Sequence, residues 1–182
     1  GGAFGDINRD GVVDVVAGPF WYAGPDYQAR HAYYEPKEFD PEGYSDNFFA
    51  HTHDFNADGW QDIFIIGFPG KEPRWYENPK GRPGHWAVHI VFDQVDNQSP
   101  HWVDLTGDGR PEIVSGSKGY LGYAEVNWSN AERPWTFHPI TEKGSWGNFT
   151  HGFGVGDING DGRMDVMQKE GDLNYHGKPF SK

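Results

Sequence analysis

The 182-residue sequence contains no cysteine, so disulfide bonds do not stabilise its fold. It has no apolar run approaching the ~20 residues that a membrane-spanning helix needs. Positive charge is also scarce, since 15 Lys and Arg stand against 27 Asp and Glu, which gives a formal net charge of −12. Such an anionic surface argues against nucleic acid and anionic membranes as partners. The sequence contains no serine nucleophile motif, phosphate-binding loop or HExxH motif, so these common catalytic signatures are missing.

Many of the acidic residues belong to a short motif that occurs four times. The copies are GDINRDGVVDV from Gly5, HDFNADGWQDI from His53, VDLTGDGRPEI from Val103 and GDINGDGRMDV from Gly156. Counted from the first aspartate, oxygen-bearing side chains occupy positions 1, 3, 5 and 9, and glycine occupies position 6. A backbone curled around a point would bring these oxygens together with the carbonyl of position 7, and six or so oxygens at ~2.3–2.6 Å suit Ca²⁺. Glycine permits the positive φ that such a turn requires.

The pattern therefore predicts up to four calcium sites, each with five ligand residues. The ligands are Asp6, Asn8, Asp10, Val12 and Asp14; Asp54, Asn56, Asp58, Trp60 and Asp62; Asp104, Thr106, Asp108, Arg110 and Glu112; and Asp157, Asn159, Asp161, Arg163 and Asp165. The third loop is expected to be the weakest, because Thr106 is neutral and Glu112 is longer than aspartate. A solvated turn is an alternative explanation of one isolated copy, but four copies, each followed by a strand-like run, favour metal binding.

An EF-hand is excluded, because it needs a bidentate glutamate at position 12. The residues at that position are Ala17, Ile65, Ser115 and Gln168. The runs that follow the loops, such as DVVAG and DIFIIG, are short and mostly apolar or β-branched, which is typical of buried strands and not of helices.

The spacing of the four copies is typical of propeller blades. Their first aspartates lie 48, 50 and 53 residues apart, and the aromatic segments FWYAGP and RWYENP repeat in phase. We therefore predict an all-β fold, a β-propeller built of four-stranded blades of ~50 residues with calcium loops. Because the chain opens inside a loop and ends partway through a unit, we expect about three and a half blades of a larger ring. The predicted units are 1–43, which would lack its inner strand, then 44–93, 94–143 and the incomplete 144–182.

The four loops, each with its following strand, resemble FG-GAP/VCBS repeats, the calcium-loop blades of integrin α-chain propellers and of many secreted bacterial proteins. HGFGVGDING, from His151, is the segment closest to the signature that gives the repeat its name. WYENP and HTHDFN are similar to segments of bacterial propellers, some of which are joined to sugar-active domains, and more weakly to the propeller part of aldos-2-ulose dehydratase. The resemblance implies a calcium-binding propeller with a link to carbohydrate chemistry.

A second set of polar residues precedes the loops. DNFFAHTHD and DNQSPHWVD both place asparagine seven residues, and histidine three residues, before the loop aspartate; in the fourth unit the pair lies further upstream. Inner strands of neighbouring blades surround one axis, so we expect these residues at the mouth of a central channel. The set comprises Asn47, Asn97, Asn148, His51, His53, His101 and His151, with Trp102 nearby. Structural hydrogen bonding between blades is the simplest role for them, and they are also candidates for ligand binding, for a transition-metal site or for a general base.

These features are consistent with two functions. The first is a calcium-binding module of a secreted protein, which serves as a scaffold or binds protein or carbohydrate and is completed by the rest of a larger propeller or by partner chains. The second is the propeller domain of a sugar-active lyase, dehydratase or hydrolase that uses the channel histidines. Calcium loops of modest affinity need the millimolar calcium found outside cells, so we expect an extracellular or periplasmic location.

Overall fold

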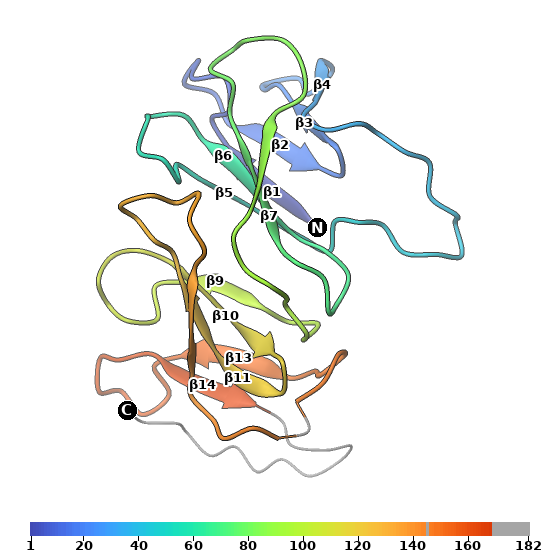
Figure 1. Ribbon diagram of the computed structural model, residues 1–182. Helices are drawn as coiled ribbons and strands as arrows, with labels where there is room; N and C mark the ends of the chain where they lie inside the picture. The colour runs from blue at the N-terminus through green and yellow to red at the C-terminus, as the bar shows by residue number, and fades with distance from the viewer. Residues whose placement is uncertain (145, 169–182) are drawn as a thin grey trace. The chain divides into compact units, whose positions relative to one another are not determined.

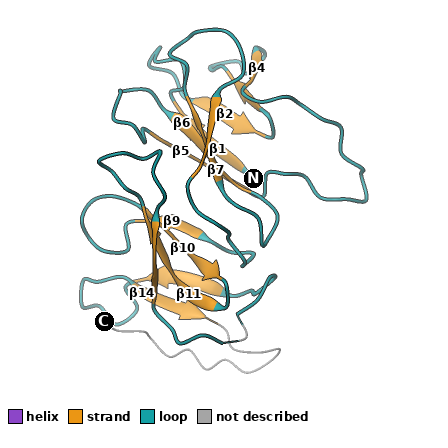
Figure 2. Ribbon diagram, in the orientation of Figure 1, coloured by secondary structure: helices purple, strands orange, loops and turns teal. Residues whose placement is uncertain are grey.

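The protein is built of antiparallel β-sheets whose strands follow one another in sequence. A computed structural model describes residues 1–144 and 146–168 (Figure 1). These residues form 14 strands, and no helix occurs among them (Figure 2). The strands make three four-stranded sheets and one two-stranded sheet, each with the up-and-down order of a propeller blade. The predicted all-β fold class is confirmed.

Each sheet corresponds to one copy of the repeated motif. The first contains β1 (Gly2–Gly5), β2 (Asp14–Ala17), β3 (Phe20–Tyr22) and β4 (Arg30–Ala32). The second contains β5 (Phe49–His53), β6 (Asp62–Ile66), β7 (Arg74–Glu77) and β8 (Ala87–Ile90). The third contains β9 (His101–Val103), β10 (Glu112–Ser117), β11 (Tyr120–Glu125) and β12 (Thr136–Pro139), and the last contains β13 (Phe153–Gly156) and β14 (Asp165–Gln168). Every acidic loop thus joins the first and second strands of its sheet.

The second strands of the second and third sheets lie wholly in the interior, as their largely apolar sequences predict: all residues of β6 and β10 are buried. The chain divides into two compact units, one made of Gly1–Asp93 with Trp128–Pro134, the other of Gln94–Asn127 with the described residues from Trp135 onward. The core of the first unit contains Ala3, Ile7, Val16, Tyr33, Ala50, Ile63, Ile65, Tyr76 and Trp86. The core of the second contains Val114, Leu121, Phe153 and Val166.

The expectation that the first unit lacks its inner strand is corrected, because β1 occupies that place. β1 pairs with β2 over its whole length, from Gly2 opposite Ala17 to Gly5 opposite Asp14. Its two glycines, Gly2 and Gly5, disfavour a strand in isolation. Glycine serves close packing here: a Cβ on Gly5 would lie 3.0 Å from Thr52 Oγ1 of β5, and a Cβ on Gly1, which precedes β1, would lie 2.5 Å from the carbonyl oxygen of Phe48, just before β5. Residues 169–182 of the predicted fourth unit lie outside the described residues.

Candidate metal loops

The four loops share one backbone conformation. Position 6 has a positive φ in every copy, as the glycines predict: 83° at Gly11, 85° at Gly59, 85° at Gly109 and 84° at Gly162. Position 4 also has a positive φ: 59° at Arg9, 57° at Ala57, 80° at Gly107 and 77° at Gly160. The sequence gives little signal for this second turn, because only two of the four copies carry glycine there.

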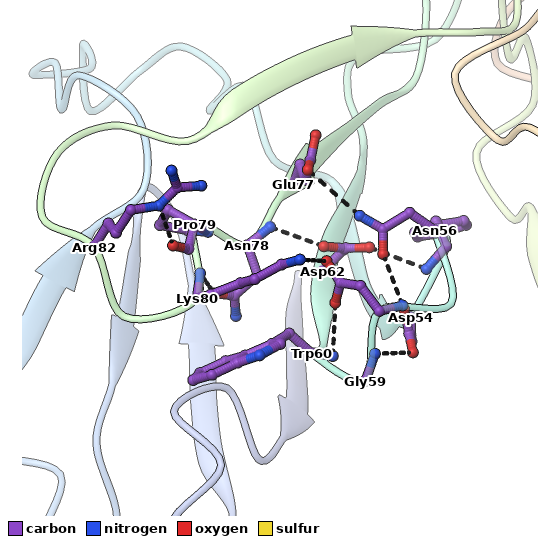
Figure 3. A network of polar contacts seen from close by, with 12 residues as sticks. Asp54, Asn56, Gly59, Trp60, Asp62, Glu77, Asn78, Pro79, Lys80 and Arg82 are labelled. Carbon is purple, nitrogen blue, oxygen red and sulfur yellow. Dashed lines mark hydrogen bonds and ion pairs between the residues drawn. The ribbon is translucent and has the colours of Figure 1, made fainter.

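The first aspartate of each loop organises the turn through its carboxylate. In the second loop, Asp54 Oδ1 accepts a hydrogen bond from the Asp58 N–H at 2.9 Å, and Oδ2 accepts one from the Gly59 N–H at 2.8 Å (Figure 3). Asp58 Oδ1 in turn accepts the Trp60 N–H at 2.9 Å. Asp6, Asp104 and Asp157 accept the corresponding bonds from positions 5 and 6. The backbone therefore curls around the side-chain oxygens, which is the geometry expected of a cation-binding loop.

The position-9 carboxylate is buried and ties the loop to the end of the third strand. Asp62 Oδ2 accepts the Phe55 N–H at 3.0 Å, and Oδ1 accepts the Asn78 N–H at 2.8 Å. In the first loop, Asp14 makes the equivalent bonds to Ile7 at 2.8 Å and Gly24 at 2.9 Å. The sequence motif predicts position 9 only as a metal ligand and does not predict these hydrogen bonds to the segment after the third strand. The one signal for them is the in-phase repeat of AGP and ENP, whose middle residues, Gly24 and Asn78, are the donors.

Burial of these carboxylates makes their negative charge unfavourable without a cation. Burial raises the pKa of Asp62 to about 7, and the charges of Asp58 and Asp54 raise it further, against the hydrogen bonds from Asn78 and Phe55. Burial likewise raises the pKa of Glu112. Grouped carboxylate and amide oxygens around a tight turn are a donor set that fits Ca²⁺, whose charge would offset this cost.

The third loop brings its carboxylates closest together. Oxygens of Asp104, Asp108 and Glu112 all lie within 4.8 Å of one another. Within the described residues, no other acidic loop brings three carboxylates this close together. Thr106 Oγ1 donates to Glu112 Oε1 at 3.1 Å, so the threonine supports the glutamate. The extra methylene of Glu112 lets its carboxylate reach further into the loop than aspartate does. This arrangement favours a ranking opposite to the one expected from ligand charge.

The repeated loops and strands match one known family of sequence repeats. The model of the FG-GAP-like repeat matches residues 54–115 and again residues 104–167. The chain belongs to the FG-GAP repeat family. Each match starts at the first aspartate of one loop and ends in the strand after the next loop, so both span two successive FG-GAP loops. A comparison with curated protein sequences finds no match.

The residues predicted at a channel mouth of this FG-GAP chain have several structural contacts. Asn47 is buried, and its Nδ2 donates to the Gly18 carbonyl at 2.6 Å and to Tyr33 Oη at 3.2 Å. Its Oδ1 accepts the Tyr34 hydroxyl at 3.1 Å. The side chain thus joins the first two FG-GAP sheets.

His51 and His53 lie on one face of β5 and contact aromatic rings. The His51 ring lies 6.2 Å from that of Phe64, and the His53 ring lies 4.9 Å from that of Trp128. Burial lowers the pKa of His53, although the neighbouring Asp54 charge acts against this shift. A lowered pKa keeps this imidazole neutral at physiological pH.

In the second unit, His101 has a defined structural contact. Its Nε2 lies 3.0 Å from the Phe153 carbonyl, a hydrogen bond from β9 to β13. Asn97 is buried, and its Oδ1 accepts the Gly116 N–H at 3.0 Å. The Trp102 ring stacks 6.2 Å from that of Trp135.

The fourth-unit pair differs from the others. His151 and Asn148 are exposed and precede β13, whereas His51 and His101 lie within strands. The convergence of His51, His101 and His151 on one site stays a prediction.

A cavity of about 400 Å³ in the first unit lies beside Asn47. Its lining includes Tyr34, Phe68, Arg74 and Tyr76. The rings of Tyr34 and Tyr76 are stacked 5.4 Å apart.

No helix among the described residues has the length and apolar character that crossing a membrane requires.

Proposed function

We propose that the chain is a calcium-binding FG-GAP propeller module of a secreted protein and that it serves as a scaffold or binding unit. The supporting observation is the oxygen-lined loop with its buried position-9 carboxylate, which occurs in all four repeats. A buried carboxylate with further carboxylates beside it is unfavourable unless a cation neutralises the charge. Four such loops in one chain therefore form a consistent case for calcium.

In this proposal calcium acts as a folding ligand. Each loop joins the first and second strands, and its position-9 carboxylate also holds the segment after the third strand in the first two sheets. An ion bound to the loop oxygens would stabilise all of these connections at once. In a chain without disulfide bonds, metal binding is an effective way to stabilise small sheets.

Isothermal titration of calcium into chelator-treated protein tests the proposal. We expect calcium binding at up to four sites, with much weaker binding of Mg²⁺, which demands stricter octahedral geometry. A matched variant, Asp54→Ala, should remove one site and leave the remaining loops intact. Absence of a calcium-binding heat, or equal binding by the wild-type chain and a variant with all four first aspartates replaced, would contradict it.

The cavity beside Asn47 supports carbohydrate binding as a second function. Its volume of about 400 Å³ falls in the usual range of ligand pockets. Tyr34 and Tyr76 present aromatic surface, while Asn47, Arg74 and Glu72 contribute polar groups, a combination suited to sugar rings and hydroxyls.

Saturation-transfer NMR with a panel of monosaccharides tests this second function. We expect transfer to at least one sugar in the wild-type protein, loss of it in Tyr34→Ala, and no change in Tyr27→Ala, which alters an exposed tyrosine that does not line the cavity. Lack of transfer to any sugar, or equal transfer in Tyr34→Ala, would count against the cavity.

A further inference from the structure

Each four-stranded sheet pairs an aromatic residue of its third strand with a histidine of its fourth strand. Trp21 stacks on His31 at 4.3 Å, and Trp75 stacks on His89 at 4.1 Å between ring centroids. In the third sheet, Tyr123 stacks on His138 at 4.8 Å. In all three sheets the partners lie directly opposite each other in the strand register. The stacking fixes the plane of each imidazole.

Two of these histidines also contact a glutamate. Glu77 follows Trp75 by two residues, so both side chains point to the same face of β7. Glu77 Oε2 lies 3.1 Å from His89 Nε2. Glu125 and His138 form the same pair in the third sheet, at 2.9 Å. A glutamate–histidine pair alone is explained by structural hydrogen bonding and does not by itself indicate a metal site.

The second sheet differs because a third ligand group joins the pair. Glu132 lies in the segment Trp128–Pro134, which packs with the first unit. Ligand atoms of Glu77, His89 and Glu132 all lie within 4.8 Å of one another. The described residues place no such third group at the Glu125–His138 pair. Two carboxylates that meet at one imidazole repel each other unless a cation lies between them.

The surroundings hold all three groups in place. Glu77 Oε1 accepts a hydrogen bond from Asn56 Nδ2 at 3.4 Å (Figure 3). This leaves Oε2 directed at the His89 imidazole. Trp128 stacks on Phe55, with a centroid distance of 6.1 Å and an interplanar angle of 6°, and so anchors the segment that carries Glu132. Such outer contacts are what orients metal ligands in known sites.

We propose that Glu77, His89 and Glu132 bind a divalent transition metal and that Zn²⁺ is the best-fitting ion. One imidazole nitrogen and two carboxylates suit zinc, which accepts nitrogen and oxygen ligands in a tetrahedron and fills its fourth position with water. Calcium prefers a larger set made only of oxygens, so this site is chemically distinct from the loops. The bound ion would fasten the segment Trp128–Pro134 to β7 and β8, a role that a disulfide bond could play in a cysteine-containing chain.

Titration of Zn²⁺ into calcium-saturated protein, followed with a competing chromophoric chelator, tests the proposal. The key variant is Glu132→Gln, which changes an exposed side chain, relieves the repulsion from Glu77 and so should not lower the zinc-free melting temperature. The matched control is Glu125→Gln, which alters the equivalent pair that lacks a third ligand. We expect Glu132→Gln to weaken zinc binding about tenfold or more, and Glu125→Gln to leave it unchanged.

Two further readouts make the result unambiguous. Zinc should raise the melting temperature of the wild-type protein and not that of Glu132→Gln. Cobalt, used in place of zinc, should give visible absorption typical of a four-coordinate site in the wild-type protein and not in the variant. The proposal is overturned if the wild-type chain binds no zinc in the presence of calcium, if Glu132→Gln binds it equally well, or if Glu125→Gln weakens binding to the same extent.

Discussion

The ammonium nitrogen of Lys80 lies 3.0 Å from Oδ2 of Asp58, a predicted calcium ligand of the second loop (Figure 3). The Lys80 backbone N–H donates to Asn78 Oδ1 at 2.9 Å, so the residue that carries this charge is held beside the loop. The equivalent residue in the first sheet is Asp26, which follows AGP as Lys80 follows ENP. The second loop therefore has an internal cation that would compete with calcium for one of its carboxylates.

Replacement of Lys80 by methionine should raise the calcium affinity of the second loop. A partly exposed ion pair contributes about 0.2–1 kcal/mol, so the gain should be about 1.4- to fivefold. Isothermal titration measures it, and Asp58→Asn identifies which of the binding events belongs to the second loop. The control is Lys37→Met, which breaks an ion pair with Asp46 that involves none of the four acidic loops. An unchanged or reduced affinity in Lys80→Met would show that the lysine supports the loop instead of competing.

Calcium binding should release protons near neutral pH because of Asp62. In the calcium-free protein its pKa is raised to about 7, so the folded chain holds this proton more tightly than the unfolded chain does. The resulting stability is fully present below the ordinary aspartate pKa of about 4 and is lost as the pH rises through about 7. Calcium should therefore raise the melting temperature more at pH 7.5 than at pH 5.

Calorimetry in two buffers with different ionisation enthalpies measures the proton release directly. At pH 6.5 we expect a buffer-dependent heat that corresponds to release of part of a proton on calcium binding. A heat that is the same in both buffers would contradict the assigned state of Asp62.

The third loop should depend on its aspartate at least as strongly as the others. The carboxylates of Asp104, Asp108 and Glu112 already converge, so calcium binding would require little rearrangement of these side chains. We expect Asp104→Ala to reduce the calcium-dependent rise in melting temperature at least as much as Asp157→Ala. The ligand types alone predict the reverse, because Thr106 is neutral. A smaller effect of Asp104→Ala would therefore show that ligand charge decides the ranking and not convergence.

Asn78 should contribute to stability independently of calcium. Its Nδ2 donates to the carbonyl oxygens of Ile7 and Gln61, both at 2.9 Å, and the side chain is buried. Asn78→Ala leaves these carbonyls unsatisfied, which should lower the free energy of unfolding by about 1–3 kcal/mol. Urea denaturation in saturating calcium measures the change, with exposed Gln28→Ala as the control. A change below about 0.5 kcal/mol would mean that water replaces the amide.

The parts of this structure that sequence predicts are the local ones. The turn at Gly162, the strand after each loop and the blade-like repeat all follow from residues close together in the chain. The inner strand of the first unit was missed because glycines at positions 1, 2 and 5 are typical of a loop, whereas Gly1 and Gly5 permit close approach to Phe48 and Thr52 of the next blade.

The contacts that sequence does not predict join residues far apart. The bond from His101 to the Phe153 carbonyl spans 52 positions, and that from Asn78 to the Ile7 carbonyl spans 71. The approach of Glu132 to His89 depends on how the segment after Trp128 packs. No local sequence pattern encodes such pairs.

Thermal unfolding with and without calcium tests the central claim most directly. Saturation of one site at a hundredfold excess over Kd stabilises the native state by about 2.7 kcal/mol, which for a chain of this size corresponds to roughly 5–10 °C. Chelator should therefore lower the melting temperature by many degrees, and added calcium, but not the same concentration of magnesium, should restore it. A melting curve that neither chelator nor calcium changes would contradict the account of the four loops as calcium sites.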